Sequence, residues 1–333
     1  LTLTSREASR HPGWLTLQDG GFTRATQPGS TAKLATALAG LNKYGAALAE
    51  KKILIRPQDL IRVRSAEPDE AGWIDMQRAI VKSNNAYFIR LANEQHLEEE
   101  MANLYLQTGF FWRGVGGYFY ERPAHNEAKE DEWRALWRRT EFRSLRRYNP
   151  DNPHATRGLG ISGAAWGQGE LTATPAAVAR LASGIANGGQ LMPHRYVLKI
   201  ADSATAPGTA EAIARSPQLT GLLTDFMKAQ SAGKRGVLGI QVAGKTGTPE
   251  RILRGARIND GWYVFFAPAA RGAGHVVCCI RIEATKGSSN AVRLAGRVVI
   301  PELQRRGYIR GFAEATPATP EPGIGLRPLP PNE

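Results

Sequence analysis

A serine and a lysine three residues apart are the first candidates for chemistry in this sequence. Ser30 and Lys33 precede an apolar series, Leu34, Leu38 and Leu41, which predicts a helix that begins at or just before Ser30. At this spacing two helical side chains share one face, so an amine lies beside a hydroxyl. A lysine that burial or nearby cations keep neutral can remove the hydroxyl proton and so activate the serine. By itself the pair also fits a helix cap followed by a solvated lysine.

Two later stretches carry polar groups that would complete such a site. Ser83-Asn84-Asn85 precedes an apolar helical series, so a hydroxyl and an amide are expected at the turn before that helix or in its first turn. Lys245-Thr246-Gly247-Thr248 offers a cation and hydroxyls, which suit a substrate carboxylate. We expect residues 240–247 to form a strand beside the substrate, where Gly247 avoids an intruding side chain.

In this order the three stretches resemble the S-x-x-K, S-x-N and K-T-G motifs of penicillin-binding protein transpeptidase domains. The resemblance runs from about Gly21 to about Tyr308, and its style is similar to that of class B proteins. The segment Trp166-Gly167-Gln168-Gly169, ahead of a Thr-Pro helix start, resembles another landmark of the family. The Thr-Gly-Glu-like turn that usually opens these domains is not found in residues 1–20.

Acyl transfer needs a role for each polar residue. Ser30 would attack a carbonyl and form an ester, and Lys33 would take its proton, with Lys245 favouring the neutral amine by like-charge repulsion. Ser83 would relay the proton to the leaving amine, and Asn85 would hold Lys33 and an amide of the bound peptide.

The remaining roles concern recognition. Lys245, Thr246 and Thr248 would bind the substrate carboxylate. The resemblance assigns the oxyanion to the backbone N–H groups of Ser30 and Thr248.

The resemblance implies a peptidoglycan D,D-transpeptidase that acts on D-alanyl-D-alanine stem peptides and is acylated by β-lactams at Ser30. No cofactor and no metal is expected. The alternatives are a D,D-carboxypeptidase or endopeptidase, a β-lactamase, and a β-lactam-sensing receptor domain. For the β-lactamase, Glu170 is the one carboxylate in a suggestive segment. Sustained hydrolysis of a β-lactam would favour that alternative.

The composition limits where the protein can act and what it can bind. No run approaches the ~18 apolar residues of a membrane span. The chain opens on Leu1 without a signal peptide, so we expect a mature or excised fragment whose membrane anchor lies outside it. The family implies the periplasmic or extracytoplasmic face of the bacterial inner membrane and a glycosyltransferase partner. A net charge of +13 fits a solvated basic surface or attraction to anionic polymers, and the absence of a nucleic-acid motif argues against nucleic acid.

The fold implied is α/β (α+β): an antiparallel sheet of about five strands flanked by helices, with an all-helical lobe at roughly 50–190. We expect one domain over 1–312 and a Pro-rich, extended or disordered tail over 313–333. The aromatic and basic segment 108–147 fits a packed helix with a solvated face or a docking surface.

Local patterns predict the elements that position the site. Helices are expected over residues 30–50, after Asn85, after Thr174 and Ser216, and over 288–307 with a kink at Pro301. Strands are expected over 262–268 and 275–282. Residues 53–63 are predicted to be a loop with short extended pieces, and residues 248–261 a polar loop. The adjacent Cys278 and Cys279 cannot close a loop and are expected to point to opposite faces of a strand.

Overall fold

The fold comes from a computed structural model of the chain. The structure describes residues 25–61, 70–112, 161–169, 171–193, 199–200, 203–204, 206, 208–253 and 256–310. The expectations for residues 1–20, for most of 108–147, for Glu170 and for the tail 313–333 lie outside these residues.

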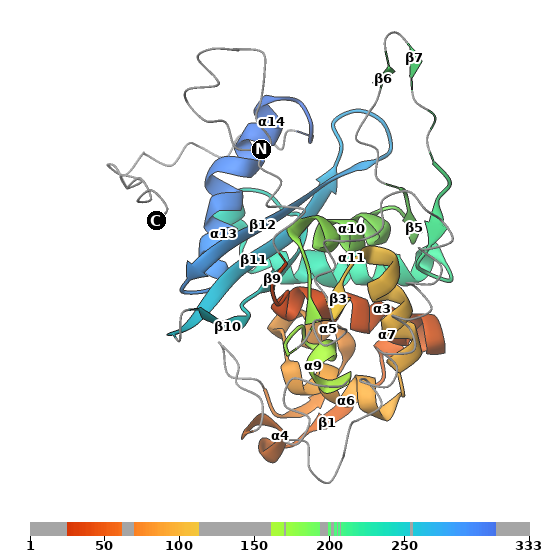
Figure 1. The fold of residues 1–333 in the computed structure, drawn as a ribbon, viewed down its shortest axis with the longest axis vertical. Helices are drawn as coiled ribbons and strands as arrows, with labels where there is room; N and C mark the ends of the chain where they lie inside the picture. The colour runs from red at the N-terminus through yellow and green to blue at the C-terminus, as the bar shows by residue number, and fades with distance from the viewer. Residues whose placement is uncertain are drawn as a thin grey trace.

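An antiparallel sheet dominates the C-terminal part of the described chain (Figure 1). Its strands are β9 (Ala243–Gly247), β10 (Glu250–Leu253), β11 (Ala256–Pro268) and β12 (His275–Thr285). The long strand β11 pairs with β12 along one edge, and with β10 and then β9 along the other. The expected fold class is confirmed. The described residues contribute four strands to this sheet, where about five were expected.

The prediction of a polar loop over 248–261 is wrong, because β10 and the first part of β11 form a hairpin there. The charged residues of this segment form ion pairs with one another. Arg257 lies 3.4 Å from Glu250, and Arg251 lies 3.0 Å from the fully buried Asp260. Charged residues are common on edge strands, where they discourage pairing with other chains. The register of β11 against β12 shifts between Asn259 and Gly261.

Beyond that shift, side chains of β11 alternate between two hydrophobic clusters. Trp262, Val264 and Phe266 belong to the larger cluster, and Tyr263 and Phe265 to the smaller one. This period of two is what a strand buried on both faces requires.

The cysteines on β12 follow the same rule. Both are free; Cys279 packs against the larger cluster and Cys278 against the smaller one, as predicted.

Helices cover both faces of the sheet (Figure 1). On one face lie α10 (Pro175–Ala186) and α11 (Pro217–Ala232). On the other lie α12 (Arg235–Leu238), α13 (Ser288–Leu294), the π-helical η4 (Ala295–Val299) and α14 (Ile300–Arg305). The expected starts after Thr174 and Ser216 are confirmed.

The last helical stretch is irregular before Pro301 and not at it. A π-helical turn occupies 295–299, and Pro301 lies in the first turn of α14, where its missing N–H is tolerated. A Cβ on Gly296 would lie 1.8 Å from Val237 O, so α12 and η4 are in close backbone contact.

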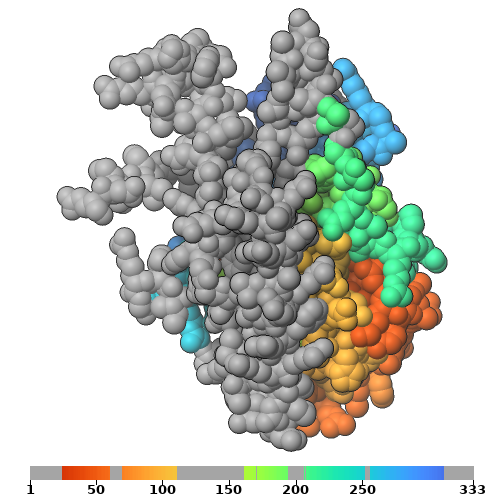
Figure 2. Space-filling model, turned by 45° about the vertical axis from the view of Figure 1, so that its right-hand side comes forward, coloured from red at the N-terminus to blue at the C-terminus, as the bar shows by residue number. Residues whose placement is uncertain are grey.

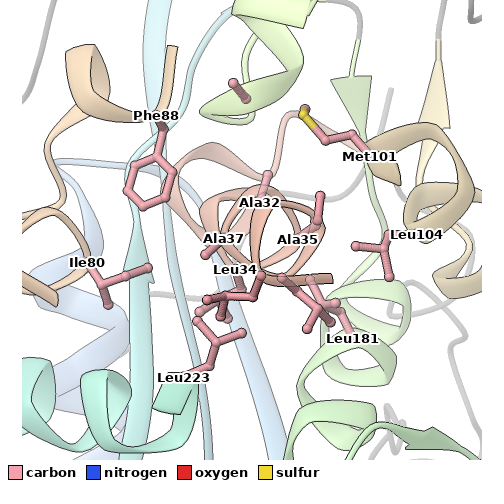
Figure 3. Packing of buried hydrophobic residues seen from close by; sticks show 14 of the residues in the cluster. Ala32, Leu34, Ala35, Ala37, Ile80, Phe88, Met101, Leu104, Leu181 and Leu223 are labelled. Carbon is pink, nitrogen blue, oxygen red and sulfur yellow. The ribbon is translucent and has the colours of Figure 1, made fainter. Parts of the chain in front are cut away.

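The helix that carries Lys33 is buried on every side over its first nine residues, Lys33–Leu41. It is α3 (Lys33–Tyr44), which the 3-10 turn η1 (Gly29–Ala32) precedes. Figure 3 shows its alanines and leucines pointing outward in several directions, among Phe88, Met101 and Leu223 of neighbouring helices. The predicted span to residue 50 is interrupted at Gly45, at φ 79°, and continues as η2 (Ala46–Ala49).

This part of the described chain holds further helices besides α3. They are α4 (Pro57–Ile61), α5 (Met76–Lys82), α6 (Asn85–Glu94), α7 (Glu98–Thr108) and α9 (Ile161–Ala165). In Figure 2 this part forms a red to yellow surface next to the green residues that follow it in sequence. No helix among the described residues is long and apolar enough to cross a membrane.

Among the described residues, four short strand pairs lie apart from the main sheet. They are β1 (Ile53–Ile55) with β2 (Gly72–Ile74), β3 (Phe111–Trp112) with β4 (Leu171–Thr172), β5 (Gln190–Leu191) with β8 (Glu211–Ala212), and β6 (Lys199–Ile200) with β7 (Ser203–Ala204). The prediction for 53–63 holds for the short extended piece β1 and is wrong for Pro57–Ile61, which are helical. Pro57 starts α4, because proline is well suited to the first helical position.

Candidate active site

Ser30 lies in the turn that leads into α3. It is the second residue of η1, directly after Pro28 and Gly29, and we call Pro28–Ser30 the serine turn. Thr31 Oγ1 donates a hydrogen bond to Pro28 O at 2.8 Å, which stabilises this turn. Ser30 is partly exposed, whereas Lys33 is fully buried. The hydroxyl is therefore open to a ligand while the amine is shielded from water.

The Lys33 side chain is held by the turn between α5 and α6. Its Nζ donates to Ser83 O and to Asn85 Oδ1, and it lies 3.2 Å from Ser83 Oγ. The same Nζ lies 5.7 Å from the ring centroid of Phe88. The amine is thus surrounded by oxygen atoms and an aromatic ring, and water does not reach it.

Two helix ends position Ser83 and Asn85. Ser83 is the C-cap of α5, in the left-handed conformation at φ 58°. Asn84 is the N-cap of α6: its Oδ1 accepts from Tyr87 N at 2.8 Å, and its Nδ2 donates to Glu70 O at 2.9 Å. Asn84 is therefore structural, and the residues on either side of it contact Lys33.

Lys245 reaches the same serine from β9. Its Nζ donates to Ser83 Oγ at 2.9 Å and to Thr246 O at 3.1 Å. Since Lys33 Nζ lies 3.2 Å from the same Oγ, one hydroxyl lies between two amines. Lys245 is fully buried and pairs with Val264 of β11, so the sheet fixes its position.

The hydroxyls that follow Lys245 are anchored to two helices. The side-chain amide of Gln230 on α11 lies 2.9 Å from Thr246 Oγ1. Thr248 Oγ1 accepts a hydrogen bond from Ser288 N, at the start of α13, at 3.1 Å. Both threonines are thus held in defined positions beside the site.

Gly247 allows β9 to approach the serine turn. A Cβ here would lie 2.8 Å from Pro28 O, 3.2 Å from Thr31 Cγ2 and 3.3 Å from Trp262 Cβ. A side chain at 247 would therefore meet atoms of the protein itself. The sequence had suggested only that it would intrude on the substrate.

One pocket, with a volume of about 150 Å³, collects these groups. Of the predicted residues, Ser30, Ser83, Asn85, Thr246, Gly247 and Thr248 line it. Lys33 and Lys245 lie behind this lining and reach it through Ser83 Oγ. Among the described residues, no three His, Cys, Asp or Glu side chains cluster as a metal site would require.

Several lining residues were not predicted. They are Gly29, Lys82, Trp166, Gln168, Glu250, Asn259 and Ser288. The sequence singled out Trp166 and Gln168 but assigned their segment to structure. Glu250 and Asn259 are register partners in the hairpin that was predicted to be a loop, and only tertiary pairing brings Asn259 to the pocket.

The rim of the pocket carries charges of both signs. Lys82 lies 3.7 Å from Glu70, and Glu250 lies 3.4 Å from Arg257. The hydrogen bond from Arg78 holds the pKa of Glu70 below its usual range. Glu70 thus remains ionised beside Lys82 at neutral pH.

One protein family matches nearly the whole chain. Its domain, the penicillin binding protein transpeptidase domain, matches residues 2–299. The peptidoglycan D,D-transpeptidase MrdA of Acinetobacter baumannii is 27% identical over 281 residues, 74% of this chain and 39% of that protein. The peptidoglycan D,D-transpeptidase PbpA of Mycobacterium tuberculosis is 35% identical over 146 residues, 40% of this chain and 30% of that protein. The chain thus matches about two fifths or less of the length of these relatives.

Solved structures share the fold. PBPA from Mycobacterium tuberculosis superposes with a TM-score of 0.60 at 22% identity, covering 90% of this chain and 68% of that one. PBP2 of Pseudomonas aeruginosa gives 0.58 at 21% identity, covering 94% and 70%. The match over residues 2–299 is decisive for the family: the chain belongs to the penicillin-binding protein transpeptidase domain family.

Proposed function

We propose that this chain is the catalytic domain of a peptidoglycan D,D-transpeptidase that works through an acyl ester of Ser30. The convergence of Ser30, Lys33, Ser83 and Lys245 on one pocket carries the proposal, because acyl transfer needs a nucleophile, a base and a proton relay together. Two relatives that match this chain over 39% and 30% of their own lengths are named peptidoglycan D,D-transpeptidases.

In the first step Lys33, as the free amine, takes the proton of Ser30. The serine oxygen attacks the carbonyl of the penultimate D-alanine, and the oxyanion accepts hydrogen bonds from backbone N–H groups at Ser30 and Thr248. The C–N bond breaks, and Ser83, which bridges the two lysines, relays a proton to the departing D-alanine. An ester of Ser30 remains.

Recognition uses the groups on the β9 side of the pocket. Lys245, Thr246 and Thr248 bind the carboxylate of the terminal D-alanine, and Asn85 orients an amide of the stem peptide. β-Lactams present a carboxylate and a reactive carbonyl at the same spacing, so they acylate Ser30 as well.

In the second step an amine of a neighbouring stem peptide attacks the ester. The C–O bond to Ser30 breaks, a new peptide bond forms, and the serine regains a proton from the attacking amine through Lys33. Water in place of the amine would give D,D-carboxypeptidase activity, so product analysis separates the two.

The surroundings of the reaction belong to the same proposal. The domain spans residues 1–312, with its helical lobe at roughly 50–190, and residues 313–333 form a tail. It acts on the extracytoplasmic side of the inner membrane, anchored through parts outside this chain, beside a glycosyltransferase. In support, a chain with this fold occurs in the solved structure of a peptidoglycan synthase complex that coordinates polymerization and crosslinking.

Labelling with a fluorescent penicillin tests the proposal. Wild type is expected to acquire one covalent label and Ser30→Ala none. Ser216→Ala is the matched control, because Ser216 is also a partly exposed serine next to a helix start but lies outside the pocket. An unlabelled wild type, or equal labelling of Ser30→Ala, would contradict the proposal. Mass spectrometry of pentapeptide products with an added acceptor amine then separates crosslinking from hydrolysis.

A further inference from the structure

The residue before Ser30 has a left-handed backbone and little room around it. Gly29 has φ +55°, so the serine turn changes direction directly ahead of Ser30. A Cβ on Gly29 would lie 2.9 Å from both Pro249 Cδ and Pro249 N. The chain after β9 therefore closes one side of the turn.

Gly167 closes another side. Gly29 N donates a hydrogen bond to Gly167 O at 2.9 Å. A Cβ on Gly167 would lie 2.0 Å from Gly29 O, 2.7 Å from Gly29 C and 2.8 Å from Gly29 N. All three are backbone atoms, so a side chain at 167 has to displace the serine turn itself.

Further hydrogen bonds hold the two segments in register. Thr26 and Ala173 form an antiparallel bridge, with N–O distances of 3.1 and 2.8 Å. Gln27 Nε2 donates to Gly169 O at 3.2 Å. Thr26, Gln27 and Gly29, which lead into Ser30, are thus each hydrogen-bonded to a residue of the segment from Gly167 to Ala173.

The same segment also faces the ligand. Trp166 and Gln168, on either side of Gly167, line the pocket with Ser30. The segment therefore combines a surface in the pocket with a backbone contact to the serine turn.

We infer that Gly167 is a positioning residue for acylation: its carbonyl and its lack of a Cβ fix the Gly29 backbone that aims Ser30 Oγ at the bound carbonyl. This inference rests on the proposed function. A displacement of about 1 Å in a reacting group costs on the order of 100-fold in rate. The effect is expected in the acylation step, because the three atoms nearest to a Cβ at 167 all belong to Gly29 and none belongs to the carboxylate-binding residues.

The test compares two glycines that share a backbone conformation and differ in their neighbours. Gly167 has φ +79° and Gly188, after α10, has φ +65°. Alanine carries a similar conformational cost at both positions. At Gly188, however, the nearest atom to a new Cβ would be Pro217 Cβ at 3.5 Å, an ordinary contact. Only at 167 does the methyl meet the serine turn.

Time courses with a fluorescent penicillin at several concentrations give the acylation rate constant and the apparent dissociation constant separately. For Gly167→Ala we expect the rate constant to fall about 100-fold with little change in the dissociation constant. Gly188→Ala is expected to keep the wild-type rate constant within about twofold. A wild-type rate constant for Gly167→Ala, or an equal loss for Gly188→Ala, overturns the inference. An unlabelled wild type would instead overturn the proposed function.

A second pair of variants decides the case if Gly167→Ala does not fold. Gln27→Ala removes the hydrogen bond to Gly169 and adds no atoms. Asn42→Ala removes hydrogen bonds to Ile213 O and from Arg215 N, at the far end of α3. We expect Gln27→Ala to acylate several-fold more slowly than Asn42→Ala. Equal rate constants for these two variants overturn the inference.

Discussion

Two lysines of α3 differ in what surrounds them. Lys33 is fully buried and contacts Ser83 and Asn85. Lys43 has a side chain that is 29% exposed and pairs with Glu100 at 3.3 Å. Only the first can exchange a proton with the pocket, so the two offer a matched comparison of the same residue type in the same helix.

Replacing Lys33 with alanine removes the base while the serine remains. We expect Lys33→Ala to slow acylation by fluorescent penicillin by about 10²–10⁴-fold, the range of a general base. Lys43→Ala is expected to label at the wild-type rate, because it removes only contacts outside the pocket: the ion pair with Glu100 and a hydrogen bond to His96 O. Labelling time courses check both variants. Fast labelling of Lys33→Ala would assign the proton transfer to another group.

The two thiols on β12 give a prediction about pH. Burial raises the pKa of Cys278 to about 11 and that of Cys279 well above its ordinary value. At pH 8 about 0.1% of the Cys278 side chain is then the reactive thiolate, and the fraction rises about tenfold per pH unit. We expect a disulfide reagent to leave native protein unmodified for many minutes at pH 8. Both thiols are expected to react at once in denaturant, and rapid reaction of native protein would contradict the burial.

The sequence predicted the polar residues that meet at the pocket better than the other residues that line it. Ser30, Lys33, Ser83, Asn85 and Lys245 could be predicted because their chemistry limits both residue type and spacing. The contact of Gly167 with Gly29 could not, because it depends on two backbones that meet across more than a hundred residues. The sequence around each glycine does not indicate which residue it will contact.

Two helices that each begin with a hydroxyl residue followed by proline test the contribution of capping. Thr174 and Ser216 both precede a proline at the first helical position. Thr174 Oγ1 accepts from Ala177 N at 3.1 Å, whereas Ser216 makes no side-chain cap bond. The two hydroxyls therefore precede proline in the same way, but only that of Thr174 makes a cap hydrogen bond.

Substitution by alanine is expected to separate them. Thr174→Ala is expected to lower the free energy of unfolding by about 1 kcal/mol, because the Ala177 N–H loses its partner. Ser216→Ala is expected to stay within about 0.5 kcal/mol of wild type. Urea titration followed by circular dichroism measures both. Equal losses would show that the cap bond at α10 contributes nothing.

Helices were easier to predict than edge strands. Helix starts carry local information in Ser, Thr, Asn and Pro, so α10 and α11 begin where the sequence indicated. The hairpin of β10 and β11 was missed because its strands carry charged residues, and those charges pair only after the strands meet. A charged edge strand and a polar loop are alike in composition.

At the scale of the whole molecule, the net charge of +13 predicts attraction to anionic cell-wall material. Attraction between exposed charges weakens as salt shortens the Debye length from about 10 Å at 0.1 M to about 3 Å at 1 M. We expect purified protein to cosediment with isolated sacculi at low salt and to be released near 1 M NaCl. Ser30→Ala is expected to behave identically, since the effect does not involve acylation. Salt-independent sedimentation would point to specific glycan contacts instead.

The register shift at Asn259 and Gly261 divides β11 into two parts with different tolerance to insertions and deletions. Within 262–268 one added residue would exchange the inward faces, sending Trp262 toward the smaller cluster and Tyr263 toward the larger one. At the start of β11, Ala256 and Arg257 are both exposed, so no buried alternation has to be preserved there. An epitope or fluorophore site inserted beside Ala256 is therefore expected to leave residues 262–268 in phase.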